Sequence, residues 1–212
     1  MPEIGKTLIA YKDPLLTQSL ERFNNHRVER IQKEDLSKYR LKEVTLENLK
    51  RGNMTFSYDG SGTPKYVAMN RRNAYADEIL FSSRKETVET NANACASYML
   101  TLKKAGIISA MHVYTSHMND PVFHIEMLLY AFATLTNLAP EGSITAYISG
   151  MHISPKSPFK PPRIRKIDII RPTLLRVVEE LLSRDVQITL IDIGKHYTRQ
   201  IYSPVTGKYN SY

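Results

Sequence analysis

The chain has 212 residues, 42% hydrophobic and 24% charged, a balance typical of a soluble globular domain that excludes global disorder. The formal net charge of +8 favours anionic partners such as nucleic acid. No apolar run reaches the roughly 18 residues that span a bilayer, and the first residues lack the order of a secretory signal. We therefore expect no membrane span and a cytoplasmic location, or the host cytoplasm or nucleus for a viral protein.

The single cysteine, Cys95, excludes an internal disulfide framework and a zinc site built from several thiolates. It lies among small residues in a segment, 86–104, whose composition predicts a long helix closed by Gly106. On this basis we interpret Cys95 as a small buried apolar side chain and not as a nucleophile.

The N-terminal portion, residues 1–53, is polar and helical in pattern. Asp13-Pro14 is a favourable helix start, and the apolar residues that follow recur at near-helical spacing. A second, short helix is predicted from Thr45 to Gly52. We expect this portion to be a helical arm or subdomain laid against the main body.

The middle of the chain opens with a predicted hairpin, whose strands are residues 54–58 and 65–69. After the predicted helix at 86–104 comes a strand at 107–115. Asn119-Asp120-Pro121 then predicts the start of a helix over 122–138 that is apolar on nearly every side and therefore central.

The last third contains the pattern of a parallel crossover. A short strand is expected at 144–148, followed by strand, helix and strand at 164–170, 172–184 and 188–193. The final segment, 196–212, predicts a hairpin or a tail. The fold class is thus α/β, with mixed α+β as the alternative: a central sheet (core domain 54–195), a C-terminal βαβ unit and the helical N-terminal portion.

Two short segments carry the chain's most specific motif. His124-Ile125-Glu126 falls in the first turn of the central helix, and Pro155-Lys156-Ser157-Pro158-Phe159 follows the next strand. In order and spacing this half of the chain resembles the zinc-dependent cytidine and nucleic-acid deaminases. That resemblance implies a histidine zinc ligand at 124, a proton-shuttling glutamate at 126, and two cysteine ligands after Pro155.

The sequence departs from that family at the metal ligands. Lys156 and Phe159 stand where the family has thiolates, and neither side chain donates an electron pair to zinc. The resemblance therefore implies a catalytically inactive member with no cofactor. In the alternative interpretation, a generic α/β domain, His124 packs at a helix start and Glu126 complements the positive end of the same helix.

Other constellations carry less information. His112, His117 and His124 are the densest group of metal-ligand types, but their spacing matches no zinc signature. Asp168 and Asp192 are predicted to lie on neighbouring parallel strands, where they would pair or accept hydrogen bonds from loops.

A basic stretch interleaved with tyrosines is better suited to binding single-stranded nucleic acid, because phosphates meet cations while bases stack on flat rings. The residues expected to form this surface are Lys156, Lys160, Arg163, Arg165, Lys166, Arg171, Lys195, Tyr197, Arg199 and Tyr202.

The sequence therefore favours a non-enzymatic protein that associates with RNA or single-stranded DNA. The resemblance adds the expectation of an inactive deaminase-like domain with an assembly or regulatory role. Two alternatives stay open. One is an active nucleotide or nucleic-acid processing enzyme with a histidine-based metal site. The other is an interaction module whose basic edge meets an acidic protein or a second copy of the chain.

Overall fold

The computed structural model describes residues 8–9, 17–18, 35–83, 87–91, 95–151, 166–193, 199–203, 206 and 208–211. Its helices are a 3-10 turn at Leu36–Tyr39, α2 (Leu46–Arg51), α3 (Pro121–Leu138) and α4 (Lys166–Ser183), with further 3-10 turns at Lys103–Ala105 and Thr115–His117. Its strands are β1 (Leu8–Ile9), β2 (Met54–Ser57), β3 (Lys65–Met69), β4 (Asn73–Ala74), β5 (Glu78–Ser82), β6 (Val88–Asn91), β7 (Ala96–Leu102), β8 (Ile107–Val113), β9 (Thr145–Gly150), β10 (Gln187–Ile193), β11 (Arg199–Ser203) and β12 (Lys208–Ser211).

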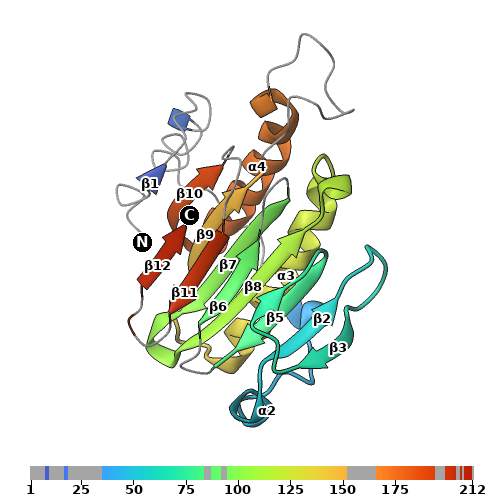
Figure 1. The fold of residues 1–212 in the computed structure, drawn as a ribbon, viewed down its shortest axis with the longest axis vertical. Helices are drawn as coiled ribbons and strands as arrows, with labels where there is room; N and C mark the ends of the chain where they lie inside the picture. The colour runs from blue at the N-terminus through green and yellow to red at the C-terminus, as the bar shows by residue number, and fades with distance from the viewer. Residues whose placement is uncertain are drawn as a thin grey trace.

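The described strands form two sheets, so the fold is a mixed α/β arrangement. The large sheet has the order β1-β10-β9-β7-β8-β5-β2-β3, and the small sheet has the order β12-β11-β6-β4. In the large sheet, β1, β10 and β9 are parallel to one another and the other neighbouring pairs are antiparallel. Figure 1 shows the small sheet in front of the large one and the long helices behind it.

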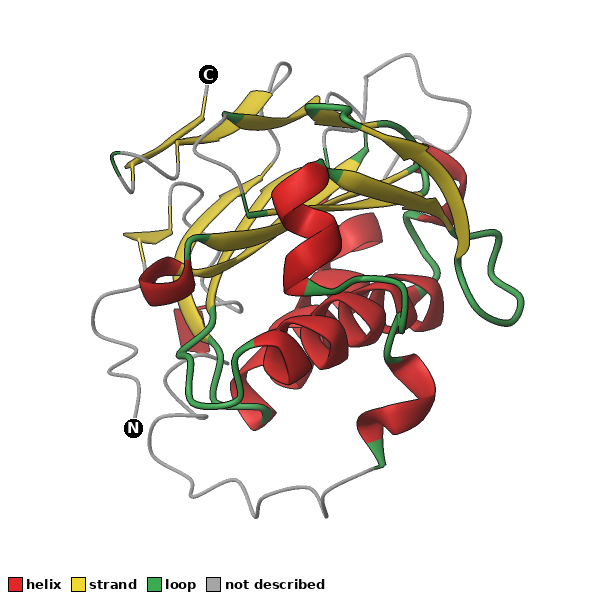
Figure 2. Cartoon of the chain, turned by 90° about the horizontal axis from the view of Figure 1, so that it is seen from below, coloured by secondary structure: helices red, strands yellow, loops and turns green. Residues whose placement is uncertain are grey.

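The large sheet is covered on both faces, by helices on one side and by the small sheet on the other (Figure 2). Successive side chains of β7 point to opposite faces of the large sheet, so the strand contributes to the core on each side. Tyr98 and Leu100 belong to the core shared with α3 and α4, whereas Met99 belongs to the core between the two sheets. A strand buried on both faces is apolar at nearly every position, which disguises its period of two.

This double burial explains one error of the sequence analysis. Residues 86–104 were predicted to form a helix, but the described part of this range contains β6, β7 and the start of a 3-10 turn. Leucine, methionine and alanine favour helices intrinsically, and here tertiary packing overrides that preference. Cys95 accordingly lies just ahead of a strand and not inside a helix.

The helix α3 follows the prediction closely. The Asp120 side chain accepts hydrogen bonds from the backbone N–H groups of Val122 at 3.0 Å and Phe123 at 3.1 Å, and Pro121 occupies the first turn. This is a strong N-terminal cap. The helix ends at Leu138, and both its flanks are largely buried against the sheet and α4.

The parallel crossover exists, but its first strand was misplaced. The predicted strand at 164–170 falls largely within α4, which begins at Lys166 and continues through Pro172. Ile170, Leu174, Val177, Val178 and Leu181 are all buried, and their spacing is that of one helical face. The crossover therefore runs from β9 through α4 to β10, which lies beside β9 in parallel.

The two ends of the chain are tied to the main body. β1 pairs with β10 at one edge of the large sheet, so the N-terminal portion contains a strand as well as helices. Leu41 and Leu49 are buried in the core shared with the sheet, and the predicted helix from Asp13 lies mostly outside the described residues. β11 and β12 form the expected C-terminal hairpin.

Candidate active site

A row of polar residues crosses the large sheet on the face that the small sheet covers. The pairing register places Asp192 beside Ser149, Ser149 beside Ser97, Ser97 beside His112, and His112 beside Glu78. The adjacent row on the same face is apolar and belongs to the core between the sheets. Burying polar groups in consecutive register across five strands costs free energy, because each group needs a hydrogen-bond partner.

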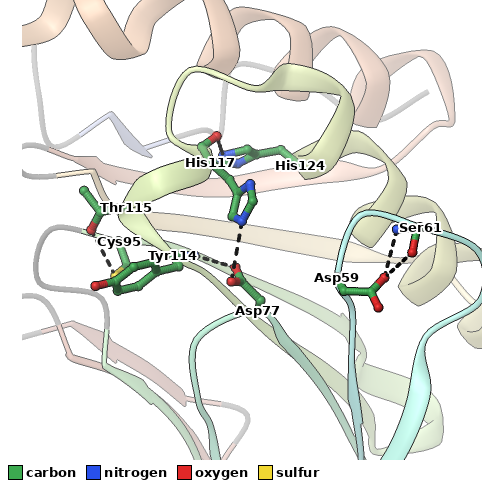
Figure 3. Close-up of polar contacts among 8 residues, drawn as sticks. All are labelled: Asp59, Ser61, Asp77, Cys95, Tyr114, Thr115, His117 and His124. Carbon is green, nitrogen blue, oxygen red and sulfur yellow. Dashed lines mark hydrogen bonds and ion pairs between the residues drawn. The ribbon is translucent and has the colours of Figure 1, made fainter. Parts of the chain in front are cut away.

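Cys95 lies just ahead of β7, two residues before Ser97. Its side chain is half-buried, and its sulfur is 3.5 Å from the hydroxyl oxygen of Thr115 (Figure 3). Its backbone carbonyl accepts a hydrogen bond of 2.8 Å from the N–H of Met151. Burial raises the pKa of the Cys95 thiol and the Asp77 carboxylate acts in the same direction, whereas the Thr115 hydroxyl lowers it. The resting side chain is therefore a protonated thiol.

His112 is fixed in one tautomer. Its Nδ1 lies 3.3 Å from the carbonyl oxygen of Ala74, which only accepts, so Nδ1 carries the proton. Its Nε2 is buried and has no hydrogen-bond partner among the residues that the structure describes. Burial lowers the pKa of His112 below its ordinary value of 6.5, while the Ala74 carbonyl opposes that shift. The ring is therefore neutral, and its Nε2 lone pair is buried and, within the described residues, unpaired.

The strand register relates these two groups. Ser97 is directly opposite His112, and Cys95, which precedes β7, lies two residues before Ser97. A thiol and an imidazole are thus close in the register, at one end of the layer between the sheets.

Asp77 holds the strand ends around this pair. Its N–H donates to the carbonyl of His112 at 2.6 Å, and its carboxylate accepts from the N–H of Tyr114 at 2.8 Å. The other carboxylate oxygen is 3.7 Å from Nε2 of His117, as Figure 3 shows. Asp77 has a φ of +58°, as does Met151, whose N–H donates to the Cys95 carbonyl; Asn70 and Asp185, elsewhere in the fold, also have positive φ.

A hydrogen-bonded network joins the row to the small sheet. The Ser97 hydroxyl donates to Oε1 of Gln200 at 2.8 Å, and the Thr90 hydroxyl contacts both the Ser97 hydroxyl and the same Gln200 oxygen. All three side chains are fully buried. Thr90 lies on β6 and Gln200 on β11, so the small sheet contributes polar groups directly above the row.

The histidine and glutamate of the deaminase-like motif have other partners. His124 is fully buried; its Nε2 donates to the carbonyl of His117 at 3.0 Å, and its Nδ1 accepts from the hydroxyl of Tyr98. Glu126 accepts a hydrogen bond from the hydroxyl of Tyr58. Both ring nitrogens of His124 are thus engaged in packing the helix start. Pro155, Lys156 and Phe159 lie outside the described residues.

The three histidines proposed as metal ligands are not brought together in one donor set. His117 stacks on Phe123 with ring centroids 3.9 Å apart, and His112 contacts the backbone of Ala74. Within the described ranges, no three histidine, cysteine or carboxylate side chains are placed to share a metal ion. Asp168, predicted to pair with Asp192 on neighbouring strands, instead lies in helix α4.

The proposed nucleic-acid surface is described only in part. Arg199 makes an ion pair with Glu89, its Nε 3.1 Å from the carboxylate. Tyr202 is 3% exposed and packs against Tyr147, so its ring is withdrawn from any base-stacking surface. Arg171 is half-buried and Lys166 begins α4. The remaining members lie outside the described residues: Lys156, Lys160, Arg163, Arg165, Lys195 and Tyr197.

Sequence reasoning missed the relation between Cys95 and His112. The signal was present in the tight turn around Gly106, which has the left-handed φ of +65°. A hairpin closed there places Leu102 opposite Ile107, and counting outward puts Ser97 opposite His112. The helical assignment of 86–104 removed that hairpin from consideration.

The sequence matches no known protein family and no curated protein at a significant level of similarity. In the part of the chain that the structure describes, no helix combines the length and apolar character needed to cross a membrane.

Proposed function

We propose that this protein is a cysteine-dependent acyl-transfer enzyme in which Cys95 is the nucleophile and His112 is the general base. The observation that carries the proposal is the state of His112. Its Nδ1 is committed to the Ala74 carbonyl, and its Nε2 lone pair lacks a partner in the described part of the chain. Cys95 lies two residues before Ser97, the residue that pairs with His112. A nucleophile beside a base that a third group orients is the general arrangement of such enzymes.

The chemistry follows from the resting protonation states. Because burial holds the Cys95 thiol protonated, attack on a carbonyl carbon requires His112 to take the thiol proton. The sulfur–carbon bond forms as that proton moves to Nε2. The tetrahedral intermediate then collapses, and the imidazolium returns its proton to the leaving group. Water, activated by the same imidazole, finally hydrolyses the thioester.

The surroundings favour an amide as the substrate. The row presents hydroxyl and carboxyl groups, among them Ser149, Asp192 and Glu78. Glu78 is already paired with Arg71 at 2.8 Å, and a neutral carboxamide both donates and accepts hydrogen bonds, as the hydroxyls of the row do. We therefore expect hydrolysis of an amide bond, with the side-chain carboxamides of proteins as the first substrates to test and ammonia as the released product.

The test compares thiol reactivity with turnover. Alkylation of Cys95 by iodoacetamide, followed by intact mass, is expected to slow at least tenfold in His112→Gln, because the base is worth about 10²–10⁴ in rate. His117→Gln is the matched control, since that ring lies outside the row. Ammonia release from casein is expected in the wild type and not in Cys95→Ala. Equal alkylation of His112→Gln and the wild type, or ammonia release by Cys95→Ala, would exclude the proposal.

A second proposal is that the protein associates with RNA or single-stranded DNA, which the net charge of +8 favours. Binding is expected at low salt and should weaken steeply as salt is raised, because released counterions dominate the affinity. Titration of single-stranded RNA and duplex DNA in parallel measures this. Absence of binding to both at low salt would exclude this proposal.

A further inference from the structure

Two exposed tyrosines lie at the end of the large sheet that carries Cys95. Tyr75 is 58% exposed and Tyr114 is 50% exposed. Both are tied to one turn, because the N–H of Glu78 donates to the carbonyl of Tyr75 at 3.1 Å and the N–H of Tyr114 donates to the carboxylate of Asp77 at 2.8 Å. Exposed apolar groups scattered singly are ordinary, but two around one turn form a patch that another molecule can cover.

Tyr114 adjoins the residue that contacts the thiol. The hydroxyl oxygen of Thr115, the next residue along the chain, is 3.5 Å from the Cys95 sulfur, and Figure 3 shows Tyr114 and Thr115 beside Cys95. The Cys95 side chain is half-buried, so part of it is accessible from outside. A molecule that lies on the Tyr114 ring is therefore next to the sulfur.

The Tyr75 ring is held in a fixed position. The Arg71 guanidinium lies over the ring, 5.3 Å from its centroid, and pairs with one carboxylate oxygen of Glu78 at 2.8 Å. The other Glu78 oxygen accepts a hydrogen bond of 2.9 Å from the backbone N–H of Tyr75. A side chain fixed in this way loses little conformational entropy when a partner covers it, which favours binding.

The residue types indicate which kind of partner covers the patch. Tyrosine and arginine are the side chains that most often anchor protein–protein interfaces. Binding to a nucleic acid depends instead on cations that neutralise phosphates. The cation in contact with the Tyr75 ring, Arg71, is already neutralised by Glu78. The patch therefore fits a polypeptide better than a phosphate backbone.

We infer that Tyr75 and Tyr114 form the docking surface for a polypeptide substrate, which places a side-chain carboxamide of that substrate at Cys95. This inference rests on the proposed reaction at Cys95. It names the substrate class as proteins that lie across the two rings, and not free amino acids. The rings contribute to binding and take no part in the bond changes at the sulfur.

The experiment separates docking from chemistry on the full chain. Ammonia release is measured over a range of casein concentrations, and alkylation of Cys95 by iodoacetamide is measured in parallel. In Tyr114→Ser, the KM for casein is expected to rise about fivefold or more with kcat little changed, because the lost contact is one of binding. The iodoacetamide rate is expected to stay within about twofold, since this small reagent needs no docking surface.

Matched variants distinguish the ring from a general loss of stability. Tyr114→Phe keeps the ring and is expected to retain the KM of the wild type. Tyr75→Ser tests the same surface, and replaces Tyr114→Ser if the latter does not fold. Tyr66→Ser is the control, because Tyr66 is also 50% exposed but lies on β3 against Phe56.

The outcomes separate this inference from the proposed function. An unchanged KM in both Tyr114→Ser and Tyr75→Ser, or an equal rise in Tyr66→Ser, overturns the docking surface and leaves the reaction at Cys95 standing. Weaker binding of single-stranded RNA by the first two variants, with an unchanged KM, assigns the rings to nucleic acid and also overturns it. If Cys95→Ala releases ammonia as the wild type does, the proposed reaction fails, and the docking surface fails with it.

Discussion

Acidification is expected to weaken the fold through one buried histidine, His124. Its side chain is fully buried, with Nε2 donating to the His117 carbonyl at 3.0 Å and Nδ1 accepting from the Tyr98 hydroxyl. A proton added at Nδ1 would remove the acceptor that Tyr98 needs. It would also place a charge among the side chains of the core, which costs free energy unless the charge is paired.

The size and sign of the effect follow from the pKa. Burial lowers the pKa of His124 from its ordinary value of 6.5 to about 4. Between those values the unfolded chain binds more protons than the folded one, so the free energy of unfolding falls as the pH falls. The contribution of His124 is complete above pH 6.5 and is lost on approaching pH 4. The gap corresponds to about 3 kcal/mol at 1.36 kcal/mol per pKa unit.

Urea unfolding at pH 7, 6, 5 and 4 measures this loss. His124→Gln keeps a donor for the His117 carbonyl and does not titrate, so its free energy of unfolding should depend less on pH than that of the wild type. His117→Gln retains the backbone carbonyl that His124 contacts and serves as the control. If the wild type and His124→Gln lose stability in parallel from pH 7 to pH 4, the buried neutral histidine is not the cause and the reasoning fails.

Two further predictions concern aspartates. Asp120→Ala removes the side-chain acceptor for the Val122 N–H at the start of α3. In urea titrations this variant is expected to lose about 1 kcal/mol of the free energy of unfolding, whereas Asp120→Asn, which keeps an acceptor, should lose much less. Asp77→Asn removes a negative charge that raises the pKa of Cys95, so the pH profile of Cys95 alkylation should shift to lower pH. Asp59→Asn, in the β2–β3 turn, is its control, and coincident profiles for the two variants would contradict the role of Asp77.

The elements with local signals were predictable. Asp120-Pro121 before an apolar run specifies α3, Thr45 and Gly52 bracket α2, and the glycines after Asp59 mark the β2–β3 turn. Each of these signals involves hydrogen bonds or backbone angles within a few residues of one another. Such interactions are present in the sequence itself and need no knowledge of the tertiary fold.

The candidate site depends on interactions that no local signal reports. Ser97 and Gln200 are 103 residues apart, and their hydrogen bond exists because β11 pairs with β6 above the large sheet. Isoleucines at 167, 169 and 170 read as a strand, since β-branched residues favour strands, although the stripe from Ile170 to Leu181 packs as a helix. The His-x-Glu pattern at His124 suggested a functional residue, but both ring nitrogens of His124 form hydrogen bonds within the core.

The contribution of β11 to the site has a consequence for biosynthesis. A ribosome releases the segment with Cys95 and His112 well before it releases Gln200, because the chain emerges from its N-terminal end. The nascent polypeptide therefore carries Cys95 and His112 before the strand that bonds to Ser97 has been made. The hydrogen bond between Ser97 and Gln200, and with it the layer between the two sheets, is completed only when translation reaches the final hairpin.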